Sequence, residues 1–232
     1  MRAALENIPL IKDSLNKYGI VNKTLQNAIL AVIGKESNFR PQTENLNYSA
    51  KRITEVWKYI PLNVAKTLEN NPAKLAAYVY GGKYGNTTPQ DAINYIGRGF
   101  NQITFKNAYK KYGDLLKIDL INNPNLLNNP KIAADAAALY FKNTFAANAK
   151  LIKNKYGIDI NLIPPGTDSQ KLLKIATNAN AGFGKAESIV NNEMQKAQQY
   201  FDYLNGKKTS FIPNLGALLL LGALTLILLK NK

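Results

Sequence analysis

The sequence predicts a mainly α-helical protein with at most a short β hairpin, followed by an apolar C-terminal membrane helix. Apolar residues recur at helical spacing along most of the chain, and glycine and proline interrupt them at intervals. The segment 95–105, YIGRGFNQITF, has too few strand-forming residues for more than a β-turn or short hairpin. A length of 232 residues fits one sizeable domain, 1–206, and a tail, 207–232.

The individual helices follow from apolar spacing and from the residues that end them. Ile8, Ile11 and Leu15 share one helical face, and Gly19 is a plausible stop. A second apolar stripe over 25–33 predicts a helix that starts near 22–24, and Pro41 prevents it from running on. Further helices are predicted over 49–59, 62–68, 72–80, 107–112, 130–145, 169–178 and 185–204, with loops over 81–91 and 151–169.

The absence of two residue types restricts the chemistry of the chain. Without histidine or cysteine, the chain has no imidazole base, no thiolate nucleophile, no Cys/His zinc site and no disulfide. Acid–base chemistry therefore falls to carboxylates, with lysine and tyrosine as poorer candidates at neutral pH.

Two glutamates lie close together in the segment 33–50, IGKESNFRPQTENLNYSA. Glu36 follows the apolar stripe of the second helix, so we expect it near the buried side, with a pKa raised by desolvation. Glu44 lies beyond Pro41 in a polar loop, where we expect a wetter setting and an ionised carboxylate. Such a pair suits glycoside hydrolysis, in which one carboxyl protonates the leaving oxygen and the other activates water or attacks. The alternative is that both are ordinary surface glutamates.

The charge of the chain favours an anionic partner. Thirty basic and 15 acidic residues give a net charge of +15, which attracts nucleic acid, phospholipid headgroups or anionic cell-wall polymers. The basic residues are scattered singly and form no recognisable nucleic-acid-binding motif, so no nucleic acid partner is expected.

The C-terminal segment differs from the rest in composition. Residues 211–229 carry no charge, and their strictly apolar part starts at Leu215 and ends at Leu229. As a helix, 19 residues span roughly 28 Å, close to the hydrocarbon thickness of a bilayer. The N-terminus lacks the apolar run of a secretory signal. These features predict a C-terminal tail anchor in a lipid bilayer, with an orientation that the flanking lysines leave open.

An ordered series of motifs resembles the glycoside hydrolase family 19 chitinases, most closely their phage endolysin branch, over about residues 22–200. The series comprises E-S-N-F, ENLNYSA, VYGGKYGN, Y-x-GRG-x-x-QIT, PNLL and N-x-G. The resemblance implies a lysozyme-like, two-lobed helical domain that inverts the anomeric centre without metal or cofactor, its carboxyls about 6.5–9.5 Å apart. It also implies roles for six residues: Glu36 as general acid, Glu44 as general base, Thr104 as a holder of the attacking water, and Arg98, Gln102 and Asn180 as sugar-binding residues.

The chain departs from the family pattern at several positions. Lys35 stands where the family often has histidine, and an ammonium there would favour the ionised form of Glu36 unless it points away. Ala108 replaces a frequent asparagine. The alternative role for Arg98 is to support its loop through backbone carbonyls, and Gln102 and Thr104 have a similar structural alternative.

Together these observations predict a membrane-anchored peptidoglycan hydrolase that cleaves between N-acetylmuramic acid and N-acetylglucosamine. A tail anchor without a secretion signal suggests a virion-associated lysin of a membrane-containing phage. The alternatives are a lytic transglycosylase, a chitinase, or an inactive membrane protein that binds the cell wall.

Overall fold

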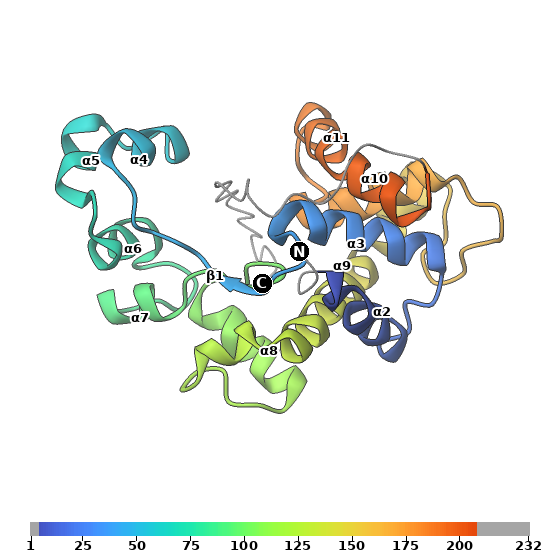
Figure 1. Cartoon of the computed structure of the whole chain (residues 1–232), viewed down its shortest axis with the longest axis horizontal. Coiled ribbons are helices and arrows are strands. Elements are labelled where there is room, and N and C mark those ends of the chain that lie inside the picture. The colour runs from blue at the N-terminus through green and yellow to red at the C-terminus, as the bar shows by residue number, and fades with distance from the viewer. Residues whose placement is uncertain (1–4, 208–232) are drawn as a thin grey trace. The chain divides into compact units, whose positions relative to one another are not determined.

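The computed structural model describes residues 5–207, and this part of the chain is mainly helical, as predicted (Figure 1). Two strands of two residues each form the only sheet within it. The elements in chain order are α2 (Asn7–Lys17), α3 (Lys23–Ser37), β1 (Gln42–Thr43), α4 (Ala50–Val56), α5 (Leu62–Leu68), α6 (Pro72–Tyr80), α7 (Pro89–Asn94), β2 (Arg98–Gly99), α8 (Lys106–Leu116), the 3-10 helix η1 (Pro124–Asn128), α9 (Pro130–Tyr156), α10 (Ser169–Ala181) and α11 (Glu187–Leu204).

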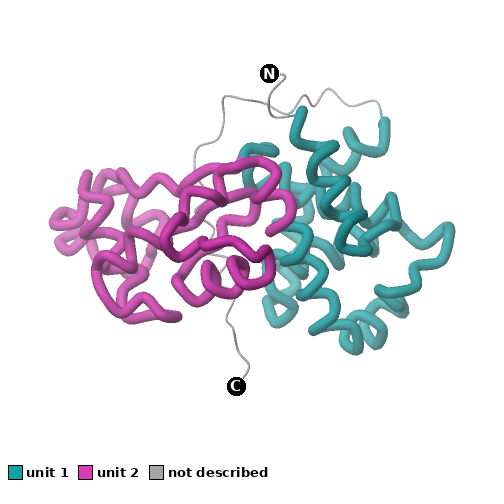
Figure 2. Tube along the Cα trace, turned by 90° about the horizontal axis from the view of Figure 1, so that it is seen from below, with its two compact units in different colours: residues 1–40, 137–218, 224–232 teal, residues 41–136, 219–223 magenta. Residues whose placement is uncertain are grey.

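The described residues form two compact units (Figure 2). Unit 1 contains residues 5–40 and 137–207, and unit 2 contains residues 41–136. The chain therefore leaves unit 1 after Arg40 and returns to it within α9. A mainly helical chain with two compact units is consistent with the expected lysozyme-like fold.

Unit 1 is built around α3. The side chain of Asn22 caps this helix by accepting a hydrogen bond from the Leu25 amide at 2.9 Å. Residues from Ala28 to Gly34 are all buried, because α10 and α11 both pack on α3 and also on one another. The helix is thus enclosed on more sides than the single stripe predicted from the sequence. It ends at Asn38 in the left-handed conformation (φ 48°), which closes the last turn onto the Gly34 carbonyl.

Unit 2 has its own apolar core, formed by residues between Leu46 and Ile96. Helices α4, α5, α6 and α7 pack in sequence order around it. The two short strands lie beside this core and are antiparallel, with Gln42 opposite Gly99 and Thr43 opposite Arg98. The predicted hairpin is present only as a bridge between Arg98 and Ile103, and the strand pairing itself joins segments far apart in the sequence.

Two helices differ from the prediction for identifiable reasons. Helix α7 was predicted as loop, although Thr88 and Asp91 form a capping box and Pro89 occupies the first turn, a recognisable start signal. Helix α9 runs eleven residues beyond its predicted end at position 145, to Tyr156, because no helix-breaking residue occurs before Gly157, whose φ is 70°.

The prediction of a membrane location is corrected by the structure. None of the helices within residues 5–207 is long and apolar enough to cross a bilayer. The segment on which the prediction rested, 211–229, lies outside the described residues. A single-pass C-terminal anchor is therefore not evident.

Candidate active site

Glu44 is fixed at the end of the short strand pair in unit 2. The Glu44 amide donates to the Gly97 carbonyl at 2.8 Å and so extends the β1–β2 ladder by one residue. In return, the Gly97 amide approaches Oε2 of Glu44 at 3.3 Å. Gly97 thus holds Glu44 in two ways: the Gly97 carbonyl accepts from the Glu44 backbone amide, and the Gly97 amide donates to the Glu44 carboxyl group.

A tyrosine from α6 completes the surroundings of this carboxyl group. The Tyr80 hydroxyl lies 2.8 Å from Oε1 and 2.9 Å from Oε2 of Glu44. Burial raises the pKa of Glu44, and the hydrogen bonds from Tyr80 and Gly97 only partly offset this effect. The expected wet, polar setting of Glu44 is therefore wrong, because strand pairing carries the residue against the body of unit 2.

Arg98 is buried, with 7% of its surface exposed, and its guanidinium is used within unit 2. It donates to the Asn94 carbonyl at 2.6 Å, to the Tyr109 hydroxyl at 2.9 Å and to Oδ1 of Asn125 at 3.1 Å. These contacts match the alternative in which Arg98 supports its loop. A sugar contact by this residue stays a prediction.

Gln102 and Thr104 lie beside the glycine that holds Glu44. A Cβ atom on Gly97 would lie only 2.7 Å from Oε1 of Gln102 and 3.4 Å from Oγ1 of Thr104, so a larger residue here would displace the Gln102 side chain. The Gln102 amide nitrogen donates to the carbonyls of Gln42 and Gly99, each at 3.0 Å. The Thr104 hydroxyl donates to the Gln102 carbonyl at 2.8 Å, which leaves its oxygen lone pairs as acceptors.

Glu36 lies at the C-terminal end of α3 in unit 1, with 13% of its side chain exposed. Its Oε1 accepts a hydrogen bond from the Asn180 side-chain amide at 2.8 Å, so the structure brings these two predicted site residues together. The Lys35 ammonium also contacts Oε1 of Glu36, and it contacts Glu193 of α11 at 2.5 Å. Glu193 in turn receives the Lys196 ammonium at 2.7 Å.

The lysine next to Glu36 points toward it rather than away. Burial acts to lower the pKa of Lys35, but its two carboxylate partners outweigh burial and raise the pKa above its ordinary value. Lys35 is therefore cationic at neutral pH and shared between Glu36 and Glu193. Sequence reasoning flagged Lys35 as a departure but missed Glu193 and Tyr80, because neither residue belongs to a motif close to its partner in the chain.

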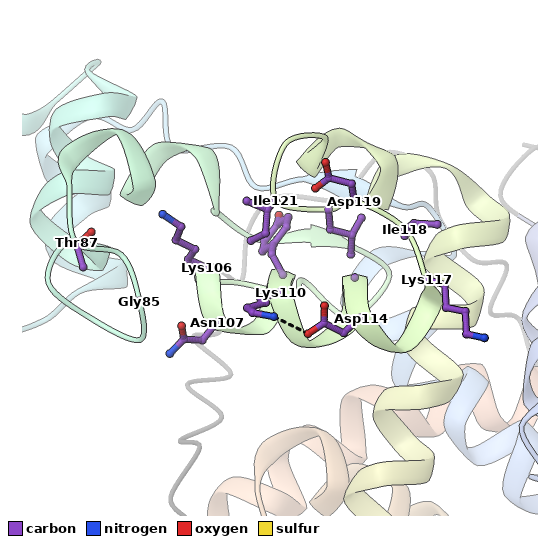
Figure 3. Close-up of a pocket in the computed structure, with 13 residues that line it drawn as sticks. Gly85, Thr87, Lys106, Asn107, Lys110, Asp114, Lys117, Ile118, Asp119 and Ile121 are labelled. Carbon is purple, nitrogen blue, oxygen red and sulfur yellow. Dashed lines mark hydrogen bonds and ion pairs between the residues drawn. The ribbon is translucent and has the colours of Figure 1, made fainter.

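A hollow of about 970 Å³ in unit 2 contains none of the predicted site residues (Figure 3). It is bordered by α8 and the segment 117–121, and its charged lining is mixed. Lys110 pairs with Asp114 at 2.8 Å, and Lys106 pairs with Asp91 at 2.9 Å. Among residues 5–207, no three acidic side chains gather in a way that could hold a metal ion.

Two comparisons with known proteins identify the family of this chain. Residues 69–207 match the family model of class I chitinases, glycoside hydrolase family 19. The chain is also 31% identical over 113 residues to chitinase 11 of Oryza sativa subsp. japonica, an alignment that covers 49% of this chain and 41% of the rice protein. Both matches agree with the family that the motif series predicted. The chain belongs to glycoside hydrolase family 19.

The family match has a boundary that matters for the site. It begins at residue 69 and so includes Arg98, Gln102, Thr104 and Asn180, but neither Glu36 nor Glu44. The roles of the two glutamates rest on the motifs around them and on the contacts described above.

Proposed function

We propose that the protein hydrolyses β-1,4 glycosidic bonds between N-acetylated amino sugars by inversion. Glu36 protonates the leaving oxygen, and Glu44 removes a proton from the water that attacks the anomeric carbon. One observation carries this proposal: in a family 19 chain without histidine, both glutamates are held by directed donors. Asn180 and Lys35 contact Glu36, whereas Tyr80 and Gly97 contact Glu44.

The remaining predicted residues assist these two groups in the proposal. Thr104 accepts a hydrogen bond from the attacking water, since its own proton is directed at the Gln102 carbonyl. Gln102 and Asn180 supply amide groups to sugar hydroxyl or acetamido groups. Arg98 holds the loop that carries Gln102 and Thr104, and we keep direct sugar contact by Arg98 as the less favoured role.

Two single variants test the assignment of acid and base. Substrates with an activated aryl leaving group need little protonation, so Glu36→Gln should retain most activity on them while losing activity on natural glycans. Glu44→Gln should be inactive on both substrates, and added azide should restore turnover. Azide attacks the anomeric carbon while the aryl oxide departs, giving a glycosyl azide of inverted configuration.

The reverse result would exchange the roles of acid and base. Two observations favour this exchange: burial raises the pKa of Glu44, a property suited to an acid, and Glu36 has a lysine counter-ion. Azide rescue of Glu36→Gln, together with retained aryl glycoside activity in Glu44→Gln, would establish the exchanged assignment. Wild-type activity in both variants would refute the two-carboxylate mechanism.

We propose peptidoglycan as the substrate, in a phage-type lysin that cleaves between N-acetylmuramic acid and N-acetylglucosamine. A net charge of +15 favours an anionic cell-wall polymer over neutral chitin. Chitin is the second candidate, because the family model describes class I chitinases and the rice relative is named a chitinase. The virion-membrane setting depended on the anchor and is not proposed.

Product analysis distinguishes these substrates and the other reaction types. The protein is incubated with purified peptidoglycan and, separately, with chitin, and the products are analysed by mass spectrometry. Reducing-end muropeptides support the peptidoglycan hydrolase, and chito-oligosaccharides without muropeptides support a chitinase. Products with 1,6-anhydro ends would show a lytic transglycosylase. No product from either polymer would leave an inactive wall-binding protein.

A further inference from the structure

The Tyr80 hydroxyl makes a hydrogen bond to Glu44 that core packing alone does not explain. The residue is 4% exposed, and its ring packs edge-on against Phe105, with ring centroids 5.5 Å apart. A phenylalanine would make the same ring contact. The hydroxyl group, however, lies within 2.9 Å of both oxygens of the Glu44 carboxyl group. The carboxyl contact therefore explains why this position has a hydroxyl group, which the ring contact does not.

The two donors leave one oxygen of Glu44 more available than the other. Among the donors of residues 5–207, the Gly97 amide and the Tyr80 hydroxyl lie within reach of Oε2, whereas only the Tyr80 hydroxyl lies within reach of Oε1. A tyrosine hydroxyl has a single proton to donate, and a carboxylate oxygen has two lone pairs. At least one lone pair of Oε1 therefore stays open to a water molecule.

Tyr80 itself is a poor candidate for the base. Burial, together with the adjacent Glu44 carboxylate, raises the pKa of Tyr80 well above its ordinary value. The phenol remains protonated through the working pH range and acts only as a donor. Any part that it takes in the reaction is through Glu44.

We propose that Tyr80 is a positioning residue that holds the carboxylate of Glu44 in its ionised form and directs Oε1 toward the attacking water. This inference rests on the proposed function, in which Glu44 is the base. In the reaction, Oε1 takes a proton from water as the water oxygen bonds to the anomeric carbon, while the Tyr80 proton stays on its own oxygen. A hydrogen bond to the carboxylate holds it in one orientation before the substrate reacts. This lowers the free energy needed to reach the reactive geometry.

The test is Tyr80→Phe, which keeps the ring and removes the hydroxyl. We expect kcat to fall about tenfold to a hundredfold, the effect of one hydrogen bond to a charged group, with KM changed less than about threefold. The bond favours the ionised carboxylate, so its loss should move the acidic limb of the pH–kcat profile to higher pH. A purely structural role would lower the amount of folded enzyme without moving this limb.

The matched control is Tyr84→Phe. Tyr84 packs on the same Phe105 ring, with centroids 4.9 Å apart, but its hydroxyl has no contact with Glu44. Its kcat and pH profile should equal those of the wild type. In a Glu44→Gln background assayed on the aryl substrate with azide, Tyr80→Phe should cause no further loss, because the residue acts only through Glu44.

Three outcomes separate this inference from the proposed function. If Glu44→Gln is inactive and Tyr80→Phe keeps both kcat and the acidic limb, the positioning role is overturned while the base assignment stands. If Glu44→Gln is active, the proposed function itself fails. Should Tyr80→Phe not fold, a fluorinated tyrosine at position 80, a stronger donor of the same shape, should move the limb to lower pH. An unmoved limb would overturn the inference.

Discussion

Replacement of Arg98 by methionine tests whether this residue supports the loop or binds sugar. Arg98 is 7% exposed, and its guanidinium makes three hydrogen bonds of 3.1 Å or less, to Asn94, Tyr109 and Asn125. Each bond to a charged group contributes about 1.5–3 kcal/mol, although such contributions are not additive. Since methionine fills much of the volume and water satisfies some carbonyls, we expect a loss of about 3–5 kcal/mol.

Such a loss is a large fraction of the total stability of a domain, about 5–15 kcal/mol. For a chain of this size it corresponds to a fall in melting temperature of about 6–20 °C, measured by circular dichroism together with urea titration. Arg52→Met is the matched control, because its ion pair with Glu55 is partly exposed and should contribute at most about 1 kcal/mol. If Arg98→Met loses less than about 1 kcal/mol but raises KM strongly, the supporting role is refuted and sugar contact takes its place.

Two further changes test packing and charge. Gly34→Ala places a Cβ 2.5 Å from the ring of Tyr200. It should destabilise the protein by about 1–3 kcal/mol, measured by urea titration, despite the better helix propensity of alanine. The control Gly184→Ala, whose Cβ meets nothing within 4 Å, should not destabilise the protein. The ion pair with Lys106 holds the pKa of Asp91 well below its usual range, so this stabilisation is complete above about pH 4 and is lost as the pH falls further. Asp91→Asn should therefore be less stable than the wild type at pH 6, and the difference should narrow at pH 2; a constant difference would contradict the assignment.

The helices were predictable because their signals are local. The apolar spacing of α2 and α3 and the capping side chain of Asn22 are contained within one or two turns of sequence. The start signal of α7 is local too, because its capping box joins Thr88 to Asp91. Local signals fail for β1 and β2, because strands of two residues have no periodicity and pair across 55 residues of chain.

The setting of Glu44 could not be predicted for a related reason. Pro41 and the polar residues around Glu44 indicated a loop, and loops are usually wet. The residue instead joins the strand ladder through Gly97, and Tyr80, 36 residues away, covers its carboxyl group. Tyr80 ends a helix whose apolar pattern explains its burial without its hydroxyl, so no local pattern connects it with Glu44.

Lys35 offers a test of whether its contact with Glu36 matters for activity. The Lys35 ammonium contacts Oε1 of Glu36, the oxygen that also accepts a hydrogen bond from Asn180. Lys35 also bonds Glu193, whose second partner Lys196 keeps this carboxylate ionised, so Glu193 competes with Glu36 for the lysine. Lys35→Met removes this ammonium and keeps much of the side-chain volume. If the ammonium helps to hold Glu36 in place, kcat on natural glycans should fall; an unchanged kcat would show that the Asn180 amide is sufficient to hold it.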